Sequence, residues 1–408
     1  MESTSLAPAP ATPAAASAVM IAPTSLAAAF AQVPDPRRAA SVVYPLAAVL
    51  ALAVTALLAN HRSVLAIAEW GARQAPALLT AIGFPGDRTP CQSTLQRLFR
   101  HLDGDALAAA LAAHIAPAAA PGGARQGIAI DGKAQRGRLR FGAGGCPIHA
   151  LSAVCHATGL VLAHEPITAD GDKAEAELTV APTLVDRLDW RDRVLTGDAL
   201  FCQRGLCRQV RAADGAGALW ALLQVKENQP ALHDAIALLF DPPADLEALP
   251  LLDRRATQTL ERGHGRTDER RCLAASTDLN GYLDWPGLAQ VFRLERTWRE
   301  HGKPHRAVHY GITSLTPDQA DPARLLALRR GHWTIENRLH RQKDVAFGED
   351  ASLIHLGQGP TVLALLRDAA LNLLHQAGMR HVAARLRLHA QYPERAAALV
   401  IAGRPAHA

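Results

Sequence analysis

The order of short apolar segments between residues 127 and 198 constrains the fold of this chain more than any other feature. Helical spacing of apolar residues covers 173–188. Four apolar runs are typical of buried strands, three before that helix and one after it: 127–130, 149–154, 160–163 and 192–195. The order strand, strand, strand, helix, strand indicates an α/β domain with a mixed sheet and flanking helices.

The region before this domain is helical in its pattern, and we expect a helical N-terminal domain over 34–120. Its apolar run over 42–58 is long enough to suggest a membrane span. Pro45 and Thr55 interrupt the run, however, and polar residues follow it, so we favour a buried helix and no membrane association. The Ala/Pro-rich stretch 1–33 is expected to be a disordered leader, and 379–408 a C-terminal tail.

Composition excludes several classes of protein. The chain has 408 residues, of which 49% are hydrophobic and 20% are charged, so a wholly disordered or collagen-like protein is excluded. Its six cysteines form no C-x-x-C pair, which argues against a disulfide scaffold or structural zinc site and indicates a reducing, cytoplasmic compartment. The net charge of +5 permits a polyanionic partner without demonstrating one.

Three acidic residues are placed where a functional site could form. Asp131 and Asp198 are each expected at the end of a buried strand, and Glu336 lies in a helix expected over 324–341. Carboxylate oxygens are ligands that Mg²⁺ prefers, and phosphodiester chemistry uses two such cations. Taken singly, an Asp-Gly after a strand is more often a turn, and a Glu in a basic helix more often half of a surface ion pair. The arrangement alone leaves both interpretations open.

Several sequence blocks resemble those of DDE insertion-sequence transposases, and the nearest group is that of the H-repeat-associated proteins. The resemblance runs in order over roughly 33–376. The blocks that carry it include Ala129-Ile130-Asp131-Gly132-Lys133, Leu195-Thr196-Gly197-Asp198-Ala199, Val225-Lys226-x-Asn228-Gln229-Pro230 and His332-Trp333-x-Ile335-Glu336-Asn337-x-Leu339-His340.

The resemblance implies a DNA transposase with an RNase H-like catalytic core over 124–378. In that core Asp131, Asp198 and Glu336 would be catalytic and would bind two Mg²⁺ ions, for which Mn²⁺ can substitute. A β-rich insertion within about 199–323 would precede the helix of Glu336 and pack beside the core. The implied partners are element-end and target DNA, with a homo-oligomer assembled on DNA at the nucleoid. The alternatives are a decayed or domesticated DNA-binding copy, and a metal-dependent nuclease without strand transfer.

The same resemblance implies a set of DNA contacts: Lys133, Lys226, Asn228, Gln229, His332, Asn337, His340 and Lys343. Regular helical spacing would place Glu336, His340 and Lys343 on one face. The broader family signature is Tyr-x2-Arg-x3-Glu-x6-Lys, and this chain departs from it, because His332 occupies the Arg position and Arg329 the Tyr position. Trp333 is expected to pack in the core rather than to stack on a base.

Overall fold

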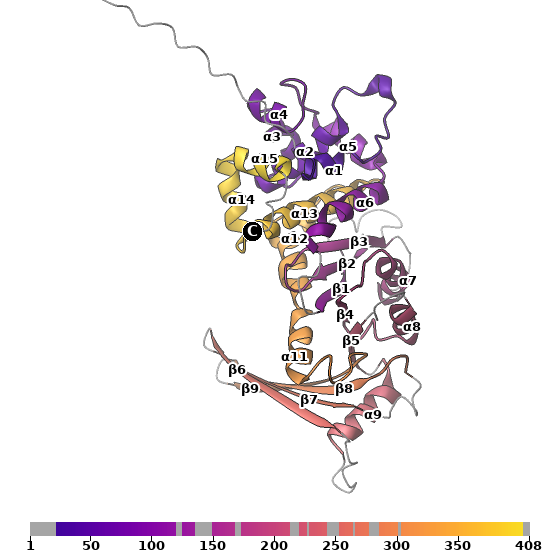
Figure 1. The fold of residues 1–408 in the computed structure, drawn as a ribbon. Helices are drawn as coiled ribbons and strands as arrows, with labels where there is room; N and C mark the ends of the chain where they lie inside the picture. Colours follow the sequence, from indigo (N-terminus) through magenta and orange to yellow (C-terminus); the bar gives the residue numbers. More distant parts are fainter. Residues whose placement is uncertain are drawn as a thin grey trace, which may run out of the picture.

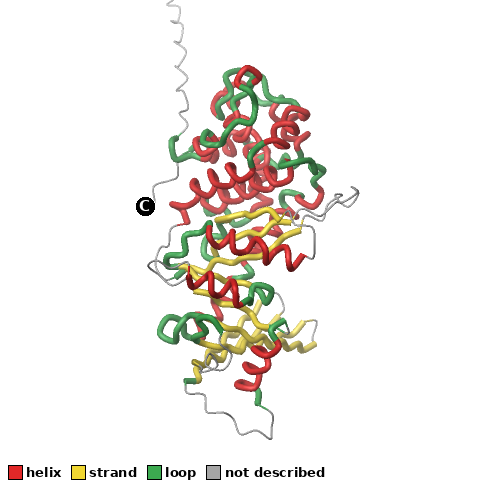
Figure 2. The backbone as a smooth tube through the Cα atoms, turned by 90° about the vertical axis from the view of Figure 1, so that its right-hand side faces the viewer, coloured by secondary structure: helices red, strands yellow, loops and turns green. Residues whose placement is uncertain are grey.

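The structure is a computed structural model, in which a helical part lies against one end of a long sheet (Figure 1). Seen from the side, the helical part, the centre of the sheet and the outer strands follow one another along the molecule (Figure 2). The residues that it describes are 22–119, 125–134, 149–167, 173–212, 220–226, 228–242, 253–263, 266–276, 285–300 and 303–402.

The core of the sheet has five strands in the order β3-β2-β1-β4-β5. Strands β1 (Gln126–Ala134), β2 (His149–Cys155) and β3 (Val161–Ile167) are antiparallel neighbours. Strands β4 (Arg193–Gly197) and β5 (Trp220–Val225) run parallel to β1. This mixed order is that of an RNase H-like core, and it confirms the fold class predicted from the sequence.

Strand β1 is apolar on both faces because helices cover both. Ile128 and Ile130 belong to a core cluster with residues of α7 (Lys173–Asp186) and α8 (Arg204–Ala212). Ala129, between them, belongs to the other large cluster, with residues of α13 (Gly359–Gln376). Successive strand residues point to opposite faces, so a continuous apolar run is what a strand between two helical layers requires.

A four-stranded antiparallel ribbon extends this sheet. After α9 (Pro230–Phe240) come β6 (Arg254–Gly263), β7 (Arg266–Ser276), β8 (Gln290–Glu300) and β9 (Lys303–Thr313). Strand β9 pairs with β5, so the described strands form one nine-stranded sheet. The β-rich insertion is therefore present, but it begins after β5 rather than at residue 199. It also continues the core sheet instead of packing beside it, because the free edge of β5 provides the pairing partner.

The N-terminal part is helical, as expected. The buried helix predicted within 42–58 is confirmed, since twelve of the thirteen residues of α2 are buried. Among the described residues, no helix combines the length and apolar character needed to cross a membrane. The helices of this part are α1 (Leu26–Phe30), α2 (Leu46–Leu58), α3 (Val64–Gly71), α4 (Pro76–Ala81), α5 (Gln92–His101) and α6 (Gly104–Ile115).

The two ends of the described chain meet in this helical part (Figure 1). Helices α14 (Val382–Gln391) and α15 (Pro393–Ile401) contribute buried residues to the same cluster as α2. The backbone N–H of Ala22 donates to the carbonyl of Ile401 at 3.1 Å. The predicted tail is thus mostly folded, and the predicted leader includes α1, because both segments bury apolar side chains against α2. Residues 1–21 lie outside the described residues.

Candidate active site

Asp131 and Asp198 hold equivalent positions on neighbouring parallel strands. The pairing of β1 with β4 ends at Ala129 and Thr196, and each aspartate lies two residues further along the chain, Asp131 within β1 and Asp198 directly after β4. Neighbouring strands are about 4.8 Å apart, so the two residues lie side by side at one edge of this pairing. Strand β1 itself continues to Ala134 along β2. The prediction that Asp131 ends a strand is therefore wrong, although it does follow the end of the β1–β4 pairing.

The loop that follows Asp198 is held by two side chains from the segment between β5 and α9. Asp198 Oδ1 accepts a hydrogen bond from the backbone N–H of Leu200 at 2.9 Å. Asn228 Nδ2 donates to the carbonyl of Ala199 at 2.7 Å, and Gln229 Nε2 donates to that of Cys202 at 3.0 Å. The amides predicted to contact DNA thus hold the Asp198 loop in place. The motif in the sequence identifies Asn228 and Gln229, but it does not predict their hydrogen bonds to the backbone carbonyls of Ala199 and Cys202.

A π-helical turn brings Glu336 to the same region. Helix α11 (Pro322–Gly331) is followed by the π-turn η4 (Glu336–His340) and then by α12 (Arg341–Val345). A π-turn contains one more residue than an α-turn and often marks a functional site. Glu336 has half of its side chain exposed, whereas the side chains of His340 and Lys343 are 5% and 3% exposed. Glu336 and His340 therefore share a face, as regular helical spacing predicts, but Lys343 does not join them and is buried against Asp368.

Asp131, Glu336 and His340 form the acidic centre of the site. One ligand atom from each lies within 4.8 Å of the others. His340 Nδ1 is 3.2 Å from Glu336 Oε2 and 3.6 Å from Asp131 Oδ2. The hydrogen bond from His340 is the main cause that lowers the pKa of Glu336, so this carboxylate is ionised at neutral pH. Asp198 is not part of this cluster.

Asp198 instead lines a neighbouring cleft of about 560 Å³. Lys226 and Asn228 line the same cleft, and so do His309 and Tyr310 of β9. The side chain of Lys226 is exposed, and an ammonium there can meet a phosphate. The Tyr310 hydroxyl donates a hydrogen bond to Asp241 Oδ2 at 2.7 Å. Asp241 does not line the cleft, and this bond holds the tyrosine ring in position.

Arg329 links the cleft to the site, although the motifs of the sequence do not mark it as a functional residue. Its guanidinium donates to Gln224 Oε1, which also lines the cleft. Burial lowers the pKa of Arg329, and the nearby charge of Asp198 opposes that shift. Arg329 occupies the Tyr position of the family signature, three residues before the expected arginine. An arginine one helical turn before the expected position is the feature of the sequence that indicates a role for Arg329.

The side chain of His332 is buried and does not reach the surface of the site. Its Nδ1 lies 3.4 Å from Thr196 Oγ1, which also lies 2.9 Å from His156 Nε2. Burial lowers the pKa of His332 to about 3 and that of His156 to about 4, so both rings are neutral. A Cβ added at Gly331 would lie 2.2 Å from His156 Nδ1, which explains the glycine there. The predicted DNA contact of His332 does not agree with this burial, because the ring is enclosed by protein side chains.

Lys343 is likewise buried rather than presented to DNA. Its Nζ lies 2.9 Å from Asp368 Oδ1 and 3.6 Å from Glu349 Oε1, and Arg367 is paired with the same glutamate at 3.3 Å. These carboxylates outweigh burial and raise the pKa of Lys343. The predicted DNA contact of Lys343 is therefore also corrected, and Glu349 is a core residue.

The remaining residues predicted to contact DNA differ in how far their side chains are exposed to solvent. Lys133 is largely buried, and its Nζ is 2.6 Å from Asp344 Oδ2, so it connects β1 to α12. The contact predicted for His340 is corrected, because that ring is buried against the carboxylates. Asn337 is exposed on the π-turn. Trp333 is 60% exposed, so the expectation that it packs in the core is wrong.

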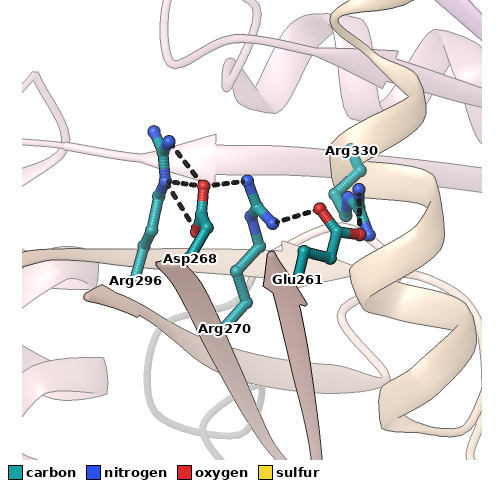
Figure 3. A network of polar contacts seen from close by, with 5 residues as sticks. All are labelled: Glu261, Asp268, Arg270, Arg296 and Arg330. Carbon is teal, nitrogen blue, oxygen red and sulfur yellow. Dashed lines mark hydrogen bonds and ion pairs between the residues drawn. The ribbon is translucent and has the colours of Figure 1, made fainter. Parts of the chain in front are cut away.

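An ion-pair network anchors α11 to the outer ribbon (Figure 3). Arg330 Nη2 of α11 is 2.6 Å from Glu261 Oε1, and Arg270 Nη1 is 3.1 Å from Glu261 Oε2. Arg270 and Arg296 both bind Asp268 at 2.7 Å. Three arginines thus share two carboxylates, which joins β6, β7 and β8 to the helix that leads into Glu336.

Comparison with known proteins places these features in a family. The sequence profile described as Transposase DDE domain matches residues 122–373, and the profile described as DDE_Tnp_1-associated matches residues 27–115. A solved piggyBac transposase synaptic complex with hairpin DNA has a TM-score of 0.38 and 11% identity, and the likeness covers 91% of this chain and 76% of that chain.

Two relatives show the degree of similarity in sequence. The chain is 30% identical over 292 residues to an uncharacterized protein in the dhlA 3′ region of Xanthobacter autotrophicus, covering 71% of this chain and 94% of that protein. It is 28% identical over 257 residues to the H repeat-associated putative transposase YhhI of Escherichia coli (strain K12), covering 60% of this chain and 63% of the relative. The predicted resemblance is confirmed: the chain belongs to the family of proteins with a transposase DDE domain.

Proposed function

We propose that this protein is an active DNA transposase that nicks the ends of an insertion sequence and joins them to target DNA. In this proposal Asp131, Asp198 and Glu336 are the catalytic residues and hold two divalent cations, Mg²⁺ or Mn²⁺. The substrates are element-end DNA and target DNA. Because two ends are joined to one target, the protein would act as a homo-oligomer assembled on DNA.

One observation carries this proposal. Two aspartates lie at matching positions past the end of the β1–β4 pairing, and a glutamate distant in sequence reaches one of them through a π-turn. An isolated turn aspartate or a surface ion pair would not require this convergence. A cluster of carboxylates at one edge of a sheet is a suitable ligand set for hard cations.

The chemistry of the donor set fits the implied metal. When bound, divalent cations would supply charge stabilisation at the scissile phosphate and at the attacking and leaving oxygens. The chain's own part is to hold oxygen ligands in place. Asp131 does so from β1, Asp198 from a loop tied down by Asn228, and Glu336 from a turn whose carboxylate is kept ionised by His340. The π-turn, β1 and the loop after β4 would then set the positions of these ligands relative to the DNA.

Exposed basic groups near this centre would bind the DNA backbone. Lys226 lines the cleft beside Asp198, while Arg338 and Arg341 are exposed on the π-turn and on α12. On the helical part, Arg97 and Arg100 are exposed along α5. Phosphate contacts of this kind give affinity with little sequence preference.

The proposal is tested with purified full-length protein and labelled DNA that flanks its own gene, with unlabelled target DNA present. Nicking and strand transfer are measured with and without Mg²⁺. We expect both products in the wild-type protein only with the cation, and neither in Glu336→Gln, which keeps the size of the side chain but removes its charge. Glu394→Gln is the matched control, because Glu394 is exposed on α15 and far from the site in sequence.

The outcomes separate the alternatives. DNA binding without products in the wild-type protein would contradict the proposal in favour of a decayed or domesticated copy. Nicking without joined target DNA would indicate a nuclease. Products that persist in Glu336→Gln would exclude this residue from the site.

A further inference from the structure

The imidazole of His340 lies between two of the three carboxylates that the proposed function assigns to metal binding. We propose that His340 is itself a ligand, through Nδ1, of the cation held by Asp131 and Glu336. That position would then have a mixed carboxylate and imidazole ligand set, and its preferred ion would be Mn²⁺ rather than Mg²⁺. The inference rests on the proposed function only in that it assumes a divalent cation at these carboxylates.

The distances suit a shared cation. In an octahedron with metal–ligand bonds near 2.1 Å, adjacent donor atoms are about 3.0 Å apart and opposite ones about 4.2 Å. His340 Nδ1 is 3.2 Å from Glu336 Oε2 and 3.6 Å from Asp131 Oδ2, and all three ligand atoms lie within 4.8 Å of one another. Shifts of a few tenths of an ångström would bring them to one cation.

The fold holds the ring in this orientation. The His340 side chain is only 5% exposed, and it ends the π-turn that begins at Glu336. A buried ring on the same turn as one carboxylate and against a strand that carries the other has little freedom to turn away. Burial also prevents the phosphate contact that the sequence had suggested for it.

The other ring nitrogen faces away from the carboxylates. Nε2 is buried and has no hydrogen-bond partner among the described residues. The ring borders a small cavity of about 10 Å³, also lined by Lys133 and Ser152, which has room for about one water molecule. Without a metal, Nδ1 donates its proton to Glu336; to bind a cation it must carry a lone pair, and the ring proton must then sit on Nε2, where such a water can accept its hydrogen bond.

The donor set determines the preferred metal. Mg²⁺ strongly prefers oxygen ligands, whereas imidazole nitrogen is a better ligand for transition metals, and Mn²⁺ accepts both. Asp198 lies outside the cluster that contains His340, so a second cation held by Asp198 would not have this imidazole among its ligands. The two positions would therefore differ in metal preference.

The experiment uses full-length protein labelled with ¹⁵N-histidine, titrated with Mn²⁺ alone and examined by pulsed electron paramagnetic resonance. We expect a ¹⁵N coupling to bound Mn²⁺, lost together with Mn²⁺ binding in Asp131→Asn. In His340→Gln the coupling should disappear, and Mn²⁺ affinity should fall about tenfold or more while Mg²⁺ affinity falls less. His355→Gln is the matched control, because that exposed ring contacts only a backbone carbonyl two residues away in the described structure.

Three other results would contradict either the role of His340 or the metal site itself. Mn²⁺ that binds in an Asp131-dependent manner without a histidine coupling would show that His340 only orients Glu336, and would leave the proposed function intact. A coupling that survives in His340→Gln would assign the ligand to another histidine. If no Asp131-dependent Mn²⁺ binding occurs, both this proposal and the metal site of the proposed function fail. The wild-type spectrum decides the main question even if a variant folds poorly.

Discussion

Lys343 Nζ lies 2.9 Å from Asp368 Oδ1, and both side chains are almost completely buried. The pair joins α12, directly after the π-turn, to the long helix α13. Glu349 and Arg367 complete a cluster of two positive and two negative groups. The family signature suggests that this lysine contacts phosphate, but in this protein it forms a buried ion pair that joins α12 to α13.

Replacing Lys343 by Met should therefore destabilise the fold. The substitution keeps the length of the side chain but leaves Asp368 and Glu349 with a single cation, and breaking a buried pair costs about 3–5 kcal/mol. Chemical denaturation measures the loss in the free energy of unfolding. The double variant Lys343→Met/Asp368→Asn should lose less than the sum of its single changes. A stable Lys343→Met protein with weakened DNA binding would show that Lys343 is a DNA contact after all.

Lys226 should show the opposite behaviour, because its side chain is exposed beside Asp198. Lys226→Ala is expected to weaken binding of element-end DNA and to reduce the slope of log affinity against log salt by about one contact. Its unfolding free energy should stay within about 0.5 kcal/mol of wild type. Binding isotherms over a series of KCl concentrations measure the slope. An unchanged slope would place the DNA elsewhere on the molecule.

The buried histidines predict a loss of stability in acid. The pKa of His332 is about 3 and that of His156 about 4 in the folded protein, against about 6.5 in the unfolded chain. The unfolded chain binds more protons below that value, so stability is complete above about pH 6.5 and falls as the pH drops toward the folded pKa values. Each histidine should cost about 1 kcal/mol between about pH 6 and pH 5.

Urea unfolding across this range measures the effect, and His156→Gln is the informative variant. Glutamine does not titrate, so the dependence of unfolding free energy on pH should fall by about one proton in this variant. An unchanged pH dependence would show that His156 is protonated in the folded state.

Much of the fold was predictable because each strand and helix has its own pattern. The apolar run Gly127–Ile130 and the helical spacing over 173–188 reflect local burial, which the sequence records directly. The position of the outer ribbon was not predictable, since it depends on β9 pairing with β5 across a long interval. The folded C-terminal helices were not predictable for a similar reason, because their small apolar faces are buried only against the distant helices of the N-terminal part.

The sequence identified the residues of the site, but it did not predict their burial or their contacts. Asp131, Asp198 and Glu336 were identified from motifs, but the π-turn has no sequence signal, and it separates Glu336 from the buried Lys343. Likewise nothing local shows that Asn228 binds the carbonyl of Ala199. Such contacts arise only when distant segments come together.

The central claim is that Asp198 acts together with Asp131 although it lies outside the compact cluster with Glu336 and His340. The most direct test is single-turnover strand transfer in Asp198→Asn, compared with Asp131→Asn, at saturating element-end DNA and Mg²⁺. We predict that both variants bind the DNA and lose strand transfer to the same extent, because each removes one charge from a shared metal site. Near-normal strand transfer in Asp198→Asn, with activity lost in Asp131→Asn, would contradict the account.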